Sequence, residues 1–190
     1  ESPSFNEKII IQEIAEKAEK LIVMSNKAIQ FLTANYAVPP EKVQLILHGV
    51  PDINYKHGLR CKQALNLEDK KTLLTFGLLN RNKGIETVIR ALPDIIKKHP
   101  DLTYIVLGKT HPQVLKYSGE EYRNYLIRLI DKLGLEEHVH FHDEFVSEKE
   151  LVQYLSATDI YITPYLNKRQ ITSGTLSYAK YTGTSADQWG

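Results

Sequence analysis

From Lys71 onward, the sequence alternates short apolar runs with amphipathic stretches, and no other feature constrains the fold as strongly. The apolar runs predict strands at residues 72–76, 102–107, 139–141 and 159–164. The amphipathic stretches predict helices at residues 84–99, 120–133, 147–157 and 174–181. Strands that alternate with helices form a parallel sheet with right-handed crossovers and helices on both faces. We therefore expect an α/β fold with a Rossmann-like, doubly wound parallel sheet.

The first 52 residues repeat this alternation on a smaller scale. The helical spacing of Ile10, Ile14 and Ala18 predicts an amphipathic first helix. Strands are expected at residues 21–25 and 43–47, with a helix between them at residues 26–36. A turn-rich sequence at residues 48–52 then interrupts the pattern.

These patterns divide the chain into four parts. Residues 1–52 are interpreted as the end of one domain, and residues 53–70 as a linker and domain entry, because they have no sustained period. Residues 71–183 form the main domain. Residues 184–190 match neither pattern and are interpreted as a tail of unclear origin.

Charge and cysteine content exclude several classes of protein. Lys and Arg number 24 against 23 for Asp and Glu, so the chain lacks the basic excess of a nucleic-acid surface. Cys61 is the single cysteine, which excludes a disulfide or a multi-cysteine zinc cluster within the chain. No apolar run reaches the length of a membrane span. We expect a cytoplasmic protein with no nucleic-acid partner and no integral membrane segment.

Ligands of doubly wound sheets bind outside the carboxyl ends of the strands, so the loops that follow the strands are the candidate sites. In the first such loop, Arg81 and Lys83 stand between Gly77 and Gly84, at a junction from strand to helix. A helix N-terminus carries a partial positive charge, and two cations beside it make a plausible diphosphate cradle. The alternative is an ordinary basic, solvated loop.

A second candidate loop precedes the last predicted helix. Ser173, Gly174 and Thr175 stand at the expected start of that helix. Gly174 would allow a ligand to approach the backbone closely, whereas Ser173 or Thr175 could serve only as an N-cap. The two roles do not exclude each other.

The histidines are weaker candidates for ligand binding. His111 follows Gly108 in a third loop and could orient a hydroxyl or a phosphate, although most loop histidines are simply exposed. His138, His140 and His142 alternate along a short strand and are expected on one face. We interpret this row as facing solvent or another domain, and expect no metal, because no acidic partner accompanies it.

The sequence lacks the motifs of several common kinds of catalysis and nucleotide binding. It contains no nucleophile elbow, no Walker A sequence, no dinucleotide-binding glycine pattern and no H-E-x-x-H. It also contains no D-x-D, the usual signature of metal-dependent sugar transfer in the GT-A fold.

Four segments together resemble the GT4 family of GT-B glycosyltransferases. They occur in the family's order and spacing at residues 48–52, 76–84, 159–165 and 170–176. The resemblance implies a GT-B enzyme with two Rossmann-like domains. The acceptor would lie mainly against the N-terminal domain and the nucleotide sugar against the C-terminal one. It also implies that the chain is a truncated GT-B half, with most of the acceptor-side domain missing.

The resemblance assigns donor-binding roles to residues of the glycine loop. Gly77 matches the glycine beside the donor diphosphate, and Lys83 matches the family's lysine. Leu78 stands where the family has an arginine, and Arg81 is our candidate substitute. Gly108 and His111 are further expected donor-binding residues.

The resemblance also covers the segments that would contact the base and the sugar. Phe145 and Val146 resemble the segment that holds the base through backbone contacts. Gln170 and Tyr178 occupy the positions of the family's two glutamates. A glutamine can still bind sugar hydroxyls, whereas a tyrosine cannot make the carboxylate's bidentate contact to ribose. With Ser173, Gly174 and Thr175, these residues complete the expected donor site.

The implied activity is metal-independent transfer of a sugar, with retention at the anomeric carbon, from a UDP- or GDP-sugar to a hydroxyl acceptor. Arg81 and Lys83 would stabilise the departing diphosphate, and the fragment is expected to be inactive alone. Two alternatives remain open: a nucleotide-sugar epimerase of the same architecture, and a non-catalytic nucleotide-binding module.

Overall fold

The computed structural model describes residues 3–50, 58–167, 173–181 and 185–187. These residues form two compact units: the first comprises the described residues up to Gly49 together with Ser173 and Gly174, and the second comprises the other described residues from Val50 onward. Within the described ranges, no helix is both long enough and apolar enough to cross a membrane.

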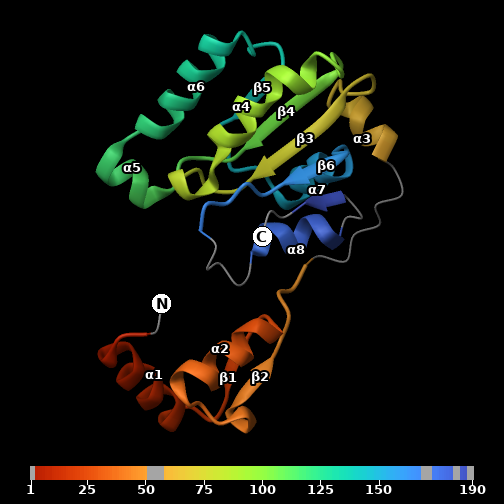
Figure 1. Ribbon diagram of the computed structural model, residues 1–190. Coiled ribbons are helices and arrows are strands. Elements are labelled where there is room, and N and C mark those ends of the chain that lie inside the picture. Colours follow the sequence, from red (N-terminus) through yellow and green to blue (C-terminus); the bar gives the residue numbers. More distant parts are fainter. Residues whose placement is uncertain (1–2, 51–57, 168–172, 182–184, 188–190) are drawn as a thin grey trace. The chain divides into compact units, whose positions relative to one another are not determined.

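The first unit is a small α/β assembly (Figure 1). It contains α1 (Phe5–Lys17), β1 (Leu21–Val23), α2 (Asn26–Tyr36), the 3-10 helix η1 (Pro40–Lys42) and β2 (Val43–Leu45). The two strands pair in parallel over their three residues. The predicted order of helix, strand, helix and strand is therefore confirmed.

The predicted apolar side of α1 is not buried. Ile10 and Ile14 are 56% and 47% exposed, whereas the neighbouring Ala15 is buried. In the described part of this unit the sheet has only two short strands, which offer little apolar surface for a 13-residue helix to cover. The periodicity predicted the helix correctly but not which side packs.

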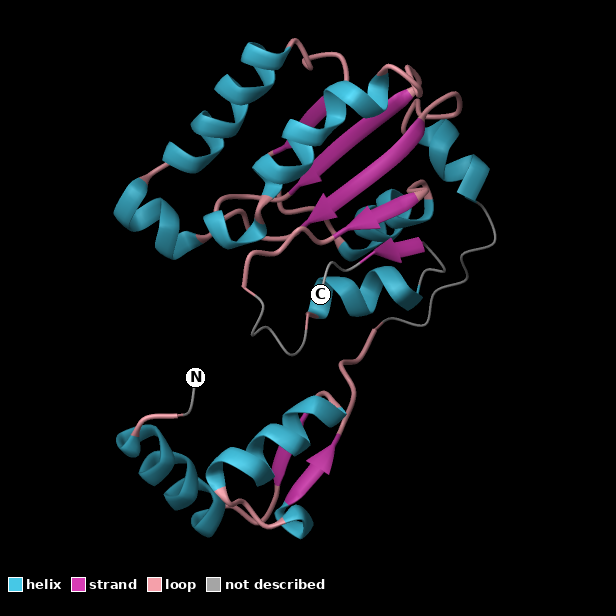
Figure 2. Ribbon diagram, viewed as in Figure 1, coloured by secondary structure: helices cyan, strands magenta, loops and turns pink. Residues whose placement is uncertain are grey.

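The second unit is built on a sheet of five parallel strands in the order β5-β4-β3-β6-β7 (Figure 2). The strands are β3 (Lys71–Phe76), β4 (Leu102–Leu107), β5 (Val139–His142), β6 (Ile160–Ile162) and β7 (Ser185–Asp187). The helical segments are α3 (Gly58–Ala64), η2 (Arg81–Lys83), α4 (Ile85–Ile96), α5 (Pro112–Ser118), α6 (Glu121–Leu133), α7 (Glu148–Ser156) and α8 (Gly174–Tyr181). The all-parallel sheet confirms the predicted α/β class.

Both faces of this sheet are covered by apolar side chains, as expected for a doubly wound fold. On one face, α4 and α6 pack on alternate residues of the central strands, such as Leu73 and Tyr104. On the other face, α7 and α8 pack on the intervening residues, such as Leu74 and Ile105. Because successive strand residues point to opposite faces, the continuous buried runs of β3 and β4 supply both cores.

The structure corrects three predicted segments. The described part of the expected linker forms α3, whose Lys62 forms an ion pair with Asp159 (Nζ to Oδ2, 2.6 Å). Such tertiary contacts stabilise a short helix that has no periodicity of its own. Residues 112–118, for which no helix was predicted, form α5, which Pro112 begins at a position that tolerates proline. Within the predicted tail, Ser185–Asp187 pairs with β6 as β7.

Candidate functional site

Two glycines end the central strands of the second unit and lie against each other. Gly77 follows β3 with φ of +115°, and Gly108 follows β4 with φ of +136°. A Cβ atom on Gly108 would overlap the carbonyl oxygen of Gly77. The Gly77 amide donates to Leu107, and the Gly108 amide to His142, each at 2.9 Å. Both positions require glycine, and they leave a bare backbone at the carboxyl edge of the sheet.

Lys83 lies directly beside this bare backbone. Its ammonium nitrogen is 3.3 Å from the position that a Cβ on Gly77 would occupy. The same nitrogen donates a 2.7 Å hydrogen bond to the Tyr165 hydroxyl and lies 4.2 Å from the centre of the Tyr165 ring. The Tyr165 hydroxyl also lies 2.8 Å from Thr175 Oγ1. We call Gly77, Lys83, Tyr165 and Thr175 the lysine cluster.

The lysine cluster joins the loop after β3 to Tyr165 and Thr175, and Tyr165 lies 82 residues beyond Lys83 in the sequence. Thr175 is the second residue of α8, and its methyl group is 3.2 Å from the position of a Cβ on Gly77. The N-terminal end of a helix carries partial positive charge, which adds to that of Lys83. Ser173 takes the N-cap position before Gly174, the first residue of α8. The cluster is thus a positively charged, hydroxyl-bearing corner, suited to a phosphate.

Arg81 points to a different partner from Lys83. Its guanidinium forms a 2.7 Å ion pair with Glu121 of α6 and lies 5.6 Å from the centre of the Tyr122 ring. Both charged side chains are more than 60% exposed, so the pair adds little stability and can exchange with a ligand at small cost. The structure therefore places Lys83, but not Arg81, in the lysine cluster.

A cavity of about 160 Å³ adjoins the two glycines. Its walls come from the ends of β3 and β4 and from the loop after β5, and they include Gly77, Gly108, Lys109, Phe145 and Val146. Phe145 is 71% exposed, and the ammonium group of Lys109 lies 5.7 Å from the centre of its ring. An apolar cavity with an exposed aromatic ring suits a flat heterocycle. Lys109 was missed in the sequence, although it directly follows a strand-ending glycine.

Arg123 is a second residue that sequence reasoning missed. Its nearly buried guanidinium donates to the Gly108 carbonyl (3.0 Å) and to Asp143 (2.7 Å). Its Nε also donates to Glu120 at 3.2 Å. Arg123 thus fixes the end of β4 to the loop after β5. The available signal was an arginine among the apolar residues of the helix predicted at residues 120–133.

Three predicted donor-site residues have other surroundings or are not described. His111 caps α5, its Nδ1 accepting a 3.2 Å hydrogen bond from the Gln113 amide. Tyr178 packs its ring against Phe76, with the ring centres 6.4 Å apart, which matches the packing role that a helix residue usually has. Gln170 lies outside the described residues.

The predicted histidine row is shorter than expected. His138 precedes β5, and its Nδ1 lies 2.8 Å from the Leu102 carbonyl oxygen, so only His140 and His142 share a face of the strand. In the described ranges, no three His, Cys, Asp or Glu side chains are grouped in a way that could hold a metal ion.

A parallel sheet with a positively charged, glycine-bounded corner at its carboxyl edge defines this protein as a Rossmann-like half of the GT-B type. The family described as glycosyl transferases group 1 matches residues 60–168, which is more than half of the chain. The chain belongs to this family.

Among curated proteins, the chain is similar to spore coat protein SA of Bacillus subtilis, with 26% identity over 159 residues. This match covers 77% of the chain and 40% of that protein. The chain is also 26% identical to the lipopolysaccharide glucosyltransferase WaaG of Escherichia coli, covering 78% of the chain and 38% of WaaG. The chain therefore spans about two fifths of the length of these relatives.

Solved structures share the fold at lower identity. The crystal structure of Anabaena Alr3699/HepE in complex with UDP superimposes with a TM-score of 0.76 and 18% identity, covering 95% of the chain and 47% of that protein. The crystal structure of WaaG superimposes with a TM-score of 0.67 and 20% identity, covering 88% of the chain and 43% of that protein. At these identities, the superpositions show a shared fold.

Proposed function

We propose that the chain is the donor-binding part of a retaining glycosyltransferase that transfers a sugar from a nucleoside diphosphate sugar to a hydroxyl acceptor. One observation carries the proposal: the lysine cluster brings a lysine, two hydroxyls and a helix N-terminus together beside a bare glycine backbone at the carboxyl edge of the sheet. Membership of the glycosyl transferases group 1 family supports the same reaction, and does not favour the epimerase alternative.

The cluster has the chemistry that such a reaction needs. The leaving group is a nucleoside diphosphate, which gains negative charge as the bond to the sugar breaks. Fixed positive groups lower the barrier when they face the developing charge. Lys83 is already held in one position by Tyr165, so little reorganisation is needed when the diphosphate binds. Arg81 can add a second charge once it leaves Glu121.

We assign the base to the cavity beside Phe145 and Val146, because this cavity lies next to the same two glycines. A UDP-sugar is the donor that we favour. Three structures of the fold relative HepE are described as complexes with UDP, with UDP and glucose, and with UDP-glucose. The acceptor would lie against parts of the protein that these 190 residues do not include.

Titration calorimetry on the 190-residue chain tests the donor assignment. We expect UDP to bind more tightly than uridine, because only UDP carries the diphosphate that Lys83 faces. GDP and ADP should bind more weakly than UDP if the cavity selects the smaller base. Equal affinities for UDP and uridine would exclude a diphosphate subsite at the lysine cluster.

We also propose that donor binding needs no metal ion, since the lysine cluster itself supplies positive charge. UDP affinity measured in EDTA should match that measured with added Mg²⁺ or Mn²⁺. A tenfold or larger gain on adding either cation would contradict metal-independent binding and would indicate a diphosphate held through a metal.

A further inference from the structure

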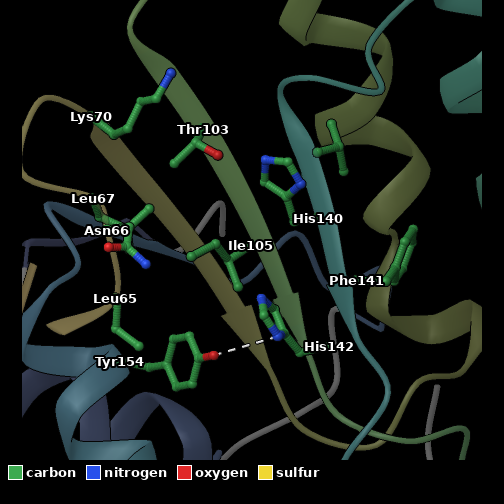
Figure 3. A pocket seen from close by; sticks show the side chains of 11 residues that line it. Leu65, Asn66, Leu67, Lys70, Thr103, Ile105, His140, Phe141, His142 and Tyr154 are labelled. Atoms are coloured by element: carbon green, nitrogen blue, oxygen red, sulfur yellow. Dashed lines mark hydrogen bonds between the residues drawn. The ribbon is translucent and has the colours of Figure 1, made fainter.

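A second cavity lies on the same sheet (Figure 3), and no residue of the lysine cluster lines it. It is a groove of about 510 Å³ at the edge strand β5, within the range of small-molecule sites. Its walls include the loop that precedes β3, the edge strand β5 with its neighbour β4, and Tyr154 of α7. None of its lining residues lines the cavity beside Phe145, so a ligand here would not occupy the donor site.

Every ionisable group that lines the groove, apart from the Tyr154 phenol, is basic. Lys70, His140 and His142 line it, and no Asp or Glu does. Partial burial and the neighbouring His142 lower the pKa of His140, and the charge of Lys70 lowers it further, whereas Glu137 acts in the opposite direction. The groove therefore has the charge of Lys70, which no acidic side chain in its own walls balances, and two histidines that add charge when they are protonated.

The two ends of the groove differ in character. Lys70 and His140 lie toward one end, and Leu65 and Tyr154 toward the other (Figure 3). At the second end the Tyr154 hydroxyl lies 3.4 Å from His142 Nδ1, and the two rings are tilted with centres 5.3 Å apart. One end thus offers charge and the other offers aromatic and aliphatic surface.

We propose that this groove binds a small organic anion, with its phosphate or carboxylate beside Lys70 and His140 and its apolar body against Leu65 and Tyr154. Such an anion offsets the repulsion between the basic groups, and its body covers apolar surface that water would otherwise contact. Binding favours the protonated form of His140, so affinity increases as pH falls. Glu137 beside His140 favours the protonated ring already in the free groove, and Glu144 and Glu150 act on Tyr154 at the other end.

Nuclear magnetic resonance of the histidine rings in the 190-residue chain tests the proposal, with phenyl phosphate as the probe. His→Gln variants assign the ring signals. At pH 6 we expect saturable shifts of the His140 and His142 signals, a higher pKa for His140 when the probe is bound, and weaker binding at pH 8. Benzoate tests whether a carboxylate suffices, and benzyl alcohol tests whether the charge is needed at all.

Matched variants show whether the probe binds in the groove, at a general surface charge or at the donor site. Lys70→Gln should weaken phenyl phosphate binding by about three- to tenfold, in the range of a partly exposed charge pair. Lys97→Gln makes the same change of charge at an exposed lysine outside the groove and should have no effect. Saturating UDP and the Lys83→Ala variant should leave the ring shifts unchanged.

Three outcomes would overturn the anion site: no saturable shift at millimolar probe, equal responses to benzyl alcohol and phenyl phosphate, or equal effects of the two lysine variants. Displacement of the probe by UDP would also overturn it, because the ring shifts would then report the donor site. The proposal does not depend on the donor assignment, since Lys83→Ala removes only that site.

Discussion

Replacing Lys83 with alanine should weaken UDP binding by about 1.5–3 kcal/mol, the range for a charge-assisted hydrogen bond. The ammonium group lies beside Gly77 and is half-buried, so solvent screens it less than an exposed lysine. Uridine affinity should change little, because uridine lacks the diphosphate. Titration calorimetry of both ligands, with circular dichroism to confirm folding, measures the effect.

Tyr165 supplies an internal check on the Lys83 result. If Tyr165 acts by holding Lys83, then Tyr165→Phe should weaken UDP binding in the native background but not in the Lys83→Ala background. Lys97→Ala serves as the control for a lost surface charge. Unchanged UDP affinity in Lys83→Ala would show that the lysine cluster does not bind the diphosphate. Additive losses would show that Tyr165 acts independently of Lys83.

The Gly108→Ala variant should lose about 2–4 kcal/mol of unfolding free energy, because two penalties act together. The φ of +136° is unfavourable for any residue with a Cβ, and that Cβ would overlap the carbonyl oxygen of Gly77. Neither strand can move away freely, since β3 and β4 are paired along all six residues. Chemical denaturation of the variant and the native chain measures the loss.

Gly134→Ala is the matched control for this loss. Gly134 ends α6 with φ of +64°, and a Cβ there would meet no atom within 4 Å. This variant should lose only about 1 kcal/mol of unfolding free energy, the cost of the left-handed conformation. Equal losses at the two glycines would show that the contact between the two strand ends does not restrict residue size.

The parts of the fold that the sequence predicted are those where one strong signal dominates. The mainly apolar segments at residues 72–76 and 102–107 predict buried parallel strands, and the capping box at Ser147 predicts the start of α7. The short helix α3 was not predicted, because it depends on contacts with the distant α7 and on the ion pair from Lys62 to Asp159, which lies 97 positions away. Single-sequence periodicity carries no information about such long-range contacts.

The same distinction applies to the candidate site. Gly77, Gly108 and Lys83 could be predicted, because a glycine after a buried strand and a lysine before the next helix are local patterns. Tyr165 and Arg123 could not, since each acts on a residue from a different strand-to-helix connection. Arg81 looked equivalent to Lys83 in the sequence, and only the fold shows that its partner is Glu121. The role of Gln170 stays a prediction.

The arrangement around Arg123 affects how this domain could be recombined with its relatives. One guanidinium connects α6, the end of β4 and the loop after β5 through Glu120, Gly108 and Asp143. A chimera that takes α6 from one parent and the loop after β5 from another would separate this buried arginine from Asp143 and weaken the pairing of its charge. Productive crossover points should therefore lie before Gly108 or after Asp143, so that Arg123 keeps all three of its acceptors.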